Sequence, residues 1–177
     1  VRHILAMNNV DEILFGNAFA TEEEFKQVAD VMKEVYVHVD KVTQFGEMIS
    51  NILPHGDLKR LPLGIELAEG VTDTEKEILH YGSHQVSEYI HYMIRSRWTR
   101  LFYKNADIPC RDCGKEYFEK GDVLIVNNNL SFYKAEIQIC MKPMKNTGQR
   151  NLVGHISKDA LCILDLIHKG DIFTITE

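Results

Sequence analysis

The hydrophobic pattern of this chain changes near Asn105, and the change limits the folds open to it. Before this point apolar residues recur at the three- and four-residue spacing of helices, and after it they alternate with polar residues as in strands. We therefore predict an α+β fold, with a mostly helical N-terminal region (residues 1–104) and a small antiparallel β-rich unit with one helix (residues 105–177). The two parts are expected either as separate units or as one continuous domain.

The helical region opens with a capping box. Thr21 is followed three residues later by Glu24, so each side chain can bond the other's backbone N–H at a helix start. Apolar residues then follow helical spacing through residues 25–36. A second helix is expected over residues 42–52, and Pro54 ends it because a proline disfavours helix in the residue before it.

A second capping box, Thr72 with Glu75, opens the longest helical segment, which we expect to run toward Tyr103. Gly82 and Ser83 interrupt this segment. The helix is therefore expected either to bend there or to end and restart with Ser83 as the next N-cap.

The C-terminal region reads as strands. Residues 122–126 and 130–139 are expected to form a β-hairpin, because the second segment alternates strictly between apolar and polar side chains. Further along, we predict a short strand over 151–156, a helix over 157–168 and a closing strand over 171–176.

The motif with the most chemical content is Cys110-Arg-Asp-Cys113-Gly-Lys. Two thiolates on one turn can hold zinc, and structural zinc needs four ligands, usually Cys and His. The residues that could complete the set are Cys140, His155, Cys162 and His168. Two free structural thiols and a redox-active pair are the alternatives to a zinc site.

Residues 110–140 resemble the knuckle and hairpin of treble-clef zinc fingers, in which a helix start then supplies the second ligand pair. This resemblance implies a zinc cofactor that organises the fold around Cys110 and Cys113. The chain departs from the treble-clef pattern because it has no Cys-x-x-Cys or His-x-x-Cys pair at the start of a later helix.

A second candidate group is His80, His84, Glu88 and His91. On a continuous helix these four residues would share one face, and imidazoles one turn apart can converge on a metal ion. The apolar residues of the same segment lie mostly on the opposite side. This face is therefore expected to meet solvent or a partner, with metal binding as the alternative.

The third candidate group combines cations with aromatic rings, including the single tryptophan of the chain. Guanidinium groups suit phosphates and flat rings suit unstacked bases, so the composition is typical of nucleic-acid contact. Alternatively, the rings belong to the core and the cations are solvated. The residues are Arg95, Arg97, Trp98, Arg100 and Lys104.

Charge is divided unevenly along the chain. Residues 1–89 hold 16 acidic and 7 basic residues, a net −9, whereas residues 90–177 have a net +3. The acidic half suggests a protein partner and the basic half an anionic one. Alternatively, the acidic residues only form the solvated faces of two helices. No apolar run reaches the roughly 20 residues of a membrane-spanning helix, so no membrane partner is expected.

From these features we predict an intracellular, cytoplasmic binding or regulatory protein, stabilised by zinc and in contact with nucleic acid through residues 95–104. The reducing cytoplasm is inferred from a Cys-x-x-Cys among only four cysteines. Two alternatives remain: a metal-dependent enzyme that uses the His80 to His91 face, and a protein-interaction adaptor. No P-loop, Gly-x-Ser-x-Gly or His-Glu-x-x-His motif indicates a reaction.

Overall fold

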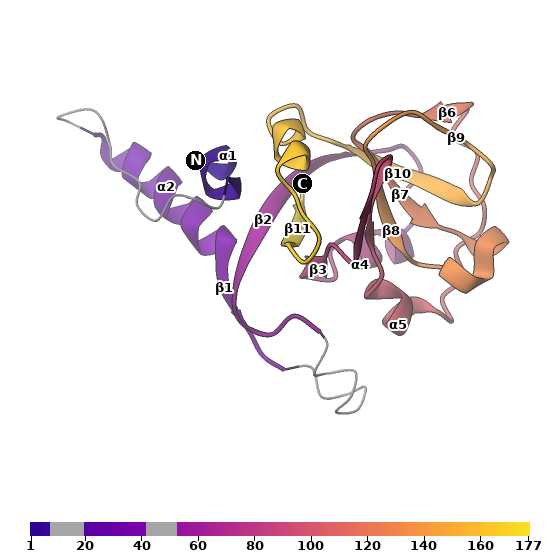
Figure 1. The fold of residues 1–177 in the computed structure, drawn as a ribbon, viewed down its shortest axis with the longest axis horizontal. Coiled ribbons are helices and arrows are strands. Elements are labelled where there is room, and N and C mark those ends of the chain that lie inside the picture. Colours follow the sequence, from indigo (N-terminus) through magenta and orange to yellow (C-terminus); the bar gives the residue numbers. More distant parts are fainter. Residues whose placement is uncertain (8–19, 42–52) are drawn as a thin grey trace.

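The computed structural model describes residues 1–7, 20–41 and 53–177. Most of this part of the chain forms a curled, mixed half-barrel sheet of nine strands with a few short helices (Figure 1). The prediction of a helical N-terminal region followed by a small β-rich unit is therefore wrong. The helix predicted over 42–52 lies outside the described residues.

Strands make up most of the elements. They are β1 (Tyr36–Val39), β2 (Gly56–Leu67), β3 (His84–Gln85), β4 (Glu88–Ile90), β5 (Met93–Ser96), β6 (Tyr117–Phe118), β7 (Asp122–Val126), β8 (Ile137–Cys140), β9 (Met144–Lys145), β10 (Arg150–Ile156) and β11 (Ile172–Thr176). The helices are α1 (Arg2–Ala6), α2 (Glu22–Val35), α4 (Asp73–Leu79) and α5 (Thr99–Tyr103), with the 3₁₀ helices η1 (Asn128–Tyr133) and η2 (Leu161–Asp165). None of the helices in the described part is both long and apolar enough to span a membrane.

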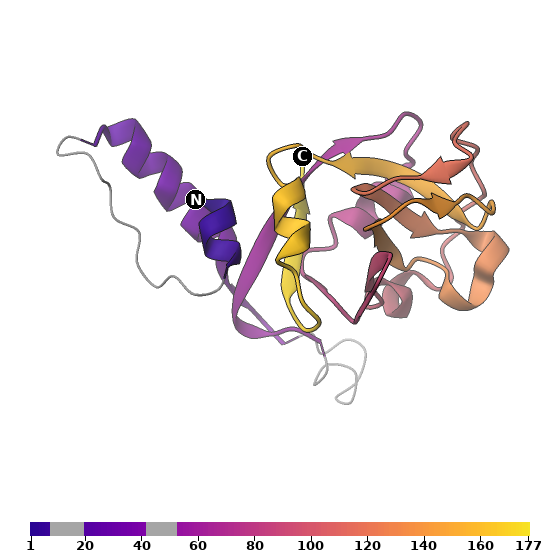
Figure 2. The ribbon, with the colours of Figure 1, turned by 45° about the horizontal axis from the view of Figure 1, so that its top comes forward.

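The long strand β2 organises the sheet. Its first residues pair with β1, its middle pairs in parallel with β11, and its end pairs antiparallel with β10. The strand order is β3-β11-β2-β10-β7-β8-β5-β4, with β1 attached to β2. Because adjacent strands twist in one sense, such a succession curls around its apolar face. Figure 2 shows this curl, with β2 at one side and η1 at the other.

Buried aliphatic side chains from the strands and from η2 fill the curl. The largest set of mutually packed residues includes Leu63, Ile125, Ile137, Val153 and Ile163, none of which is exposed. The core therefore draws on residues as far apart in the sequence as Ala6 and Ile175.

Both predicted capping boxes are confirmed. Thr21 accepts a hydrogen bond from the backbone N–H of Glu24 at 3.2 Å, and the Thr21 N–H donates to the Glu24 carboxylate at 2.7 Å. Thr72 and Glu75 make the same exchange at 3.2 and 2.9 Å. These signals succeed because every partner lies within one helical turn.

The helix predicted from Thr72 toward Tyr103 ends at Leu79 instead. Gly82 then adopts a φ of 118°, and the chain continues as β3, β4 and β5 before the short helix α5. The strand β5 is buried between β4 and β8, so its backbone groups bond to neighbouring strands rather than within a helix. Sheet pairing thus overrides the helical spacing of the apolar residues.

The predictions for the C-terminal region hold better. The strand β7 pairs antiparallel with β8, which confirms the hairpin, although η1 fills the connection and shortens the second strand. The predicted strands over 151–156 and 171–176 correspond to β10 and β11. The helix predicted over 157–168 is reduced to the five residues of η2.

His84 is a buried histidine at the start of β3. Its Nε2–H donates to the carbonyl of Leu79 at 2.8 Å, its ring stacks on Phe173, and its Nδ1 has no hydrogen-bond partner among the described residues. Burial lowers the pKa of His84 from 6.5 to about 4, so the ring is neutral at pH 7.

We expect the stability of the protein to fall in mild acid because of His84. Between pH 6.5 and 4 the unfolded state binds the proton that the buried ring does not, so stability decreases as the pH falls through this range. From pH 7 to pH 5 this amounts to about 2 kcal/mol. Urea unfolding at both pH values should show this loss in the wild type and little of it in His84→Gln.

The difference between the two proteins isolates His84 from other histidines. His38, for example, has a pKa raised by its hydrogen bond to Asp57, and that effect is present in both proteins. An equal acid sensitivity in the two proteins would contradict the assignment.

Candidate functional site

A cluster of arginine and glutamate side chains lies on one face of β4, β5 and β8. In the strand register Glu88 is opposite Arg95, and Arg95 is opposite Gln138. Side chains two residues apart on a strand share a face, so Arg97, just beyond β5, joins the same row. The sheet thereby brings together residues that are up to 50 positions apart in the sequence.

Glu136 is at the centre of this cluster, and its side chain is fully buried. Its carboxylate accepts hydrogen bonds from Arg95 Nε at 2.6 Å and Arg95 Nη2 at 3.1 Å. Arg97 Nε and Arg100 Nη1 are 3.8 and 3.6 Å from the same carboxylate. One buried anion thus holds three guanidinium groups in place.

Further polar contacts extend the cluster on both sides. Arg95 Nη1 and Arg97 Nη2 both donate to Glu88 Oε2, at 2.7 and 2.5 Å. Gln138 donates to Glu136 at 2.7 Å and accepts from Arg150 Nε at 2.6 Å. Three arginines therefore share two carboxylates, and Arg150 joins the cluster through Gln138, so the arginines outnumber the carboxylates and the cluster is positively charged.

The pKa of Arg95 reflects this arrangement. Burial favours the neutral form, but the hydrogen bond and the charge of Glu136 outweigh it, so the pKa of Arg95 is raised. Burial lowers the pKa of Arg150, which reaches Glu136 only through Gln138.

Aromatic rings from η1 cover part of the cluster. Arg100 lies over the rings of Phe132 and Tyr133, with its Cζ 5.4 and 5.0 Å from their centroids. Arg95 lies over Tyr133 at 5.1 Å. Phe132 is 74% exposed, so it presents an apolar ring to solvent beside Arg100.

A cavity of about 680 Å³ opens between α5 and η1, next to this cluster. It is lined by Arg97, Trp98, Arg100, Leu101, Phe102, Lys104, Asn105, Ser131, Phe132 and Lys134. Four of these side chains are cationic and none is acidic. In the described part of the chain neither Lys104 nor Lys134 forms an ion pair. The cavity therefore offers positive charge beside aromatic rings.

Ala135 holds an unusual backbone conformation at the edge of this cavity. Its φ of 67° is in the left-handed region, which costs a non-glycine residue on the order of 1 kcal/mol or more. Its carbonyl accepts from Thr99 Oγ1 at 2.5 Å. This turn separates Lys134, which lines the cavity, from the buried Glu136.

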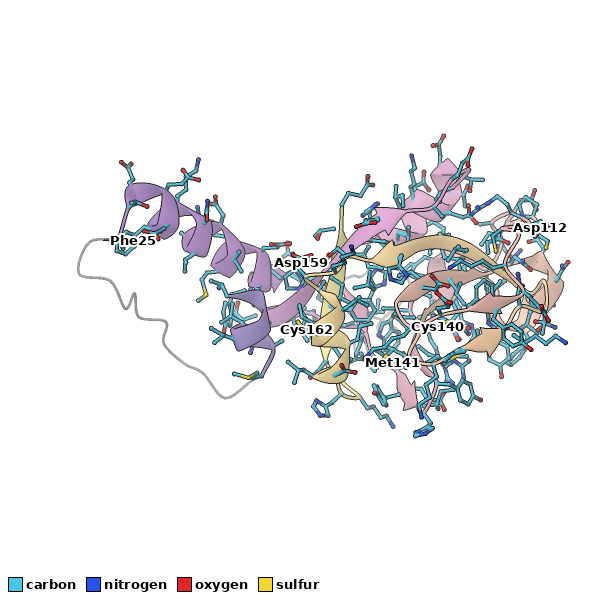
Figure 3. All side chains as sticks on the ribbon, turned by 90° about the horizontal axis from the view of Figure 1, so that it is seen from above. Phe25, Asp112, Cys140, Met141, Asp159 and Cys162 are labelled. Carbon is cyan, nitrogen blue, oxygen red and sulfur yellow. The ribbon has the colours of Figure 1, made fainter. Side chains whose placement is uncertain are left out.

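The residues predicted to bind zinc do not converge. Cys110 Sγ donates to the Gly148 carbonyl, Cys140 is buried in β8, and Cys162 is exposed on η2. In Figure 3, Asp112, which lies between the two knuckle cysteines, is at the right edge of the molecule, whereas Cys162 lies near its middle. Across the described residues no group of three or more His, Cys, Asp or Glu could hold a metal ion.

The remaining predicted ligands have other partners. His155 Nδ1 is 3.0 Å from Asp122, and Cys113 Sγ accepts from Asn146. Burial raises the pKa of the Cys140 thiol to about 12, which disfavours the thiolate that binds metal.

The four residues of the predicted His and Glu face do not share a helix face. His80 caps α4 and lies 3.0 Å from Glu177, while His84 is buried in β3. Glu88 belongs to the arginine cluster on β4, and His91 contacts Lys142. The helix on which the four would have shared a face ends before His80, so their side chains separate.

The residues of the basic aromatic segment 95–104 are divided between the arginine cluster and the cavity. Arg95 and Arg97 are bound to Glu88 and Glu136, while Trp98, Arg100 and Lys104 line the cavity. The sequence pattern does not single out Lys134, Glu136 and Phe132. Lys134 and Glu136 lie on the polar side of the alternating segment 130–139, which is also what a solvated strand shows.

Two other buried carboxylates are held by cations. Asp122 bonds to Lys115 at 2.9 Å and to His155, and Glu75 bonds to Arg111 at 3.2 Å. Every buried carboxylate in the described residues is therefore paired with a positively charged or imidazole side chain.

Comparison with known proteins matches most of the chain to a family. The family model described as "6-phospho-N-acetylmuramidase, C-terminal" matches residues 61–176. No curated protein matches the chain.

The solved structures that are similar to the chain include a protein from B. cereus and one from Enterococcus faecalis. An uncharacterized B. cereus protein is 28% identical, with a TM-score of 0.75 over 99% of this chain and 43% of its own. A conserved protein from Enterococcus faecalis, of unknown function, is 24% identical, with a TM-score of 0.53 over 66% of this chain and 30% of its own, and shows the fold alone. The chain thus spans less than half the length of either protein.

The family match corrects the functional prediction. It points to a glycosidase-like enzyme family, so the prediction of a regulatory protein that binds nucleic acid is wrong. Zinc and metal binding likewise find no support among the described residues. Cation-rich aromatic segments suit any phosphate-bearing ligand, so composition alone does not single out nucleic acid.

Proposed function

The chain belongs to the family of 6-phospho-N-acetylmuramidase C-terminal regions, and from this premise we propose that it is part of a glycosidase that acts on 6-phosphorylated muramyl sugars. Within that enzyme its role is to bind the phosphorylated sugar. The observation that supports this role is the cavity between α5 and η1, which is lined by four cations and no carboxylate.

The chemistry of the cavity suits a sugar phosphate. Phosphate oxygens accept charge-assisted hydrogen bonds from guanidinium and ammonium groups, here Arg97, Arg100, Lys104 and Lys134. Sugar rings pack their C–H faces on exposed aromatic rings, and Phe132 offers such a ring. At about 680 Å³ the cavity is within the size range of small-molecule sites.

The carboxylates indicate whether this part of the enzyme binds the substrate or transfers a proton to it. Glycoside hydrolysis commonly uses two carboxyl groups that flank the scissile bond, one of them as an acid. In the described ranges the buried carboxylates are all engaged by cations or histidine, and none of them lines this cavity. We therefore assign binding, rather than proton transfer, to this part of the enzyme.

We expect the double variant Lys104→Gln/Lys134→Gln to bind 6-phospho-N-acetylmuramic acid about tenfold more weakly than the wild type. Two charge-assisted contacts are lost, and about 1.4 kcal/mol corresponds to a factor of ten. Because neither lysine forms an ion pair among the described residues, folding should be unaffected. Isothermal titration calorimetry of the purified chain measures the change.

The matched control is Lys145→Gln, which removes one charge from an exposed lysine on β9, outside the cavity. Its affinity should equal that of the wild type. If the double variant also kept full affinity for the phosphorylated sugar, the phosphate would bind elsewhere and the assignment would be wrong.

A further inference from the structure

Side chains at the start of α5 bond to backbone carbonyls on the opposite wall of the cavity between α5 and η1. Thr99 Oγ1 donates to the carbonyl of Ala135 at 2.5 Å, and neither residue is exposed. Arg100 Nη2 donates to the carbonyl of Phe132 at 2.6 Å. Arg100 and Phe132 line the cavity, whereas Thr99 and Ala135 are buried and do not line it. The two walls are therefore connected in part by residues that a ligand in the cavity does not touch.

Ala135 is the first residue of a β-bulge between β7 and β8. The Val126 carbonyl accepts from the Ala135 N–H at 2.9 Å, and the Val126 N–H donates to the Glu136 carbonyl at 3.0 Å, so two residues are opposite one. In the bulge type whose first residue is left-handed, that residue is usually glycine. Ala135 has this conformation, with a φ of 67°. The surrounding structure therefore holds the bulge in a conformation that alanine itself disfavours.

Two contacts hold Ala135 in this conformation. Its methyl group packs in the largest core cluster, and its carbonyl accepts the hydroxyl of Thr99. Because a buried carbonyl without a partner costs free energy, the hydroxyl favours the peptide orientation that reaches it. The residues on either side of Ala135 belong to the candidate site, since Lys134 lines the cavity and Glu136 is the buried anion of the arginine cluster. The orientation of this peptide thus determines where both side chains lie.

We infer that Thr99 and Ala135 are positioning residues, which hold Lys134 in place for a phosphorylated ligand before that ligand binds. The inference rests on the proposed function for the identity of the ligand. Thr99 acts through the carbonyl of Ala135 and not by contact with the ligand. A cavity wall that is ordered in advance raises the affinity, because binding does not have to immobilise the wall.

The variants Thr99→Val and Thr99→Ser separate this role from packing. Valine has nearly the shape of threonine but no hydroxyl, whereas serine keeps the hydroxyl and loses the methyl group. We expect Thr99→Val to bind 6-phospho-N-acetylmuramic acid about tenfold more weakly than the wild type, and Thr99→Ser to bind it within about twofold of the wild type. Calorimetric titration measures both. If Thr99 only filled space, serine would weaken binding more than valine, and that order would overturn the inference.

Lys134→Gln tests whether Thr99 acts through Lys134. In the wild-type background this substitution should weaken binding of the sugar about threefold, because a charge-assisted contact is lost. In the Thr99→Val background it should weaken binding by less than about 1.5-fold, because the lysine is already displaced. Equal effects in the two backgrounds would mean that the residues are not coupled, and the role through Lys134 would be wrong.

Hydrogen exchange of the unliganded protein tests the positioning without any sugar. The amides of residues 134–136 all donate to backbone carbonyls, and they should exchange about tenfold faster in Thr99→Val than in the wild type or in Thr99→Ser. Faster exchange in Thr99→Val, together with a wild type that does not bind the sugar, would remove the proposed function alone. Unchanged exchange and unchanged sugar affinity in Thr99→Val would remove the positioning role alone.

Ala135→Gly carries the test if Thr99→Val does not fold by circular dichroism. Glycine adopts the left-handed conformation without strain and many others as well, so the bulge is no longer held in one arrangement. We expect faster exchange of the amides of residues 134–136 and about threefold weaker binding of the phosphorylated sugar. Exchange and affinity equal to those of the wild type would overturn the inference.

Discussion

Glu136→Gln should destabilise the protein by about 4 kcal/mol, the largest effect we expect from any single substitution. The wild-type carboxylate is fully buried and lies within 4.0 Å of nitrogens of Arg95, Arg97 and Arg100. Glutamine has the same shape but no charge. In this variant the guanidinium of Arg95, which is 14% exposed, loses its ion pair with residue 136 and keeps only the one with Glu88.

The matched comparison is Glu88→Gln. The carboxylate of Glu88 also contacts Arg95 and Arg97, but its side chain is 38% exposed. Solvent screens this pair, so a cost of about 1 kcal/mol is expected. Urea unfolding of both variants gives the two free energies. Equal losses would mean that burial of Glu136 does not organise the arginine cluster.

Gly154→Ala should cost about 3 kcal/mol because no side chain fits at this position. Gly154 is opposite Leu67 at the β-bulge of β10. A Cβ there would lie 2.6 Å from the backbone carbonyl oxygen of Glu66 and 2.6 Å from Ile65 Cδ1. The carbonyl belongs to the neighbouring strand, so the two strands must separate to admit a methyl group.

Gly64→Ala is the matched control, since it is also a glycine on a strand of the same sheet without a positive φ. Its Cβ would meet Ser157 Oγ at 2.6 Å, and a hydroxyl at the end of a side chain can rotate away. We expect a loss below 1 kcal/mol. Thermal unfolding should therefore rank the variants wild type, Gly64→Ala, Gly154→Ala, and the reverse ranking of the two variants would contradict the packing described at β10.

Features whose partners are close in sequence were predictable. The capping boxes at Thr21 and Thr72 and the β7–β8 hairpin each depend on residues that lie within a few positions or on one strict alternation. The structure of the region between Leu79 and Thr99 was not predictable in this way. Its strands are two to four residues long, too short to display a period of two, and their identity comes from pairing with β8 and β11.

The candidate site was likewise predictable only where its residues are close together in the sequence. The segment Arg95 to Lys104 was identified by composition, but its charge balance depends on Glu136, 41 residues away from Arg95. Only the register of β5 against β8 brings these two side chains together. Without Glu136 and the cavity at η1, the cations resembled a nucleic-acid surface. The zinc prediction depends on the local spacing of Cys110 and Cys113, which suits two zinc ligands. The fold brings no further ligands to them among the described residues.

The central claim is that the cavity between α5 and η1 recognises the phosphate of a 6-phosphorylated muramyl sugar. The most direct measurement is calorimetric titration of the wild-type chain with 6-phospho-N-acetylmuramic acid and with N-acetylmuramic acid, which differ only in the phosphate. The account predicts at least tenfold tighter binding of the phosphorylated sugar, with a preference that shrinks as salt is raised. Equal affinity for the two sugars, or a preference unaffected by Lys104→Gln/Lys134→Gln, would contradict it.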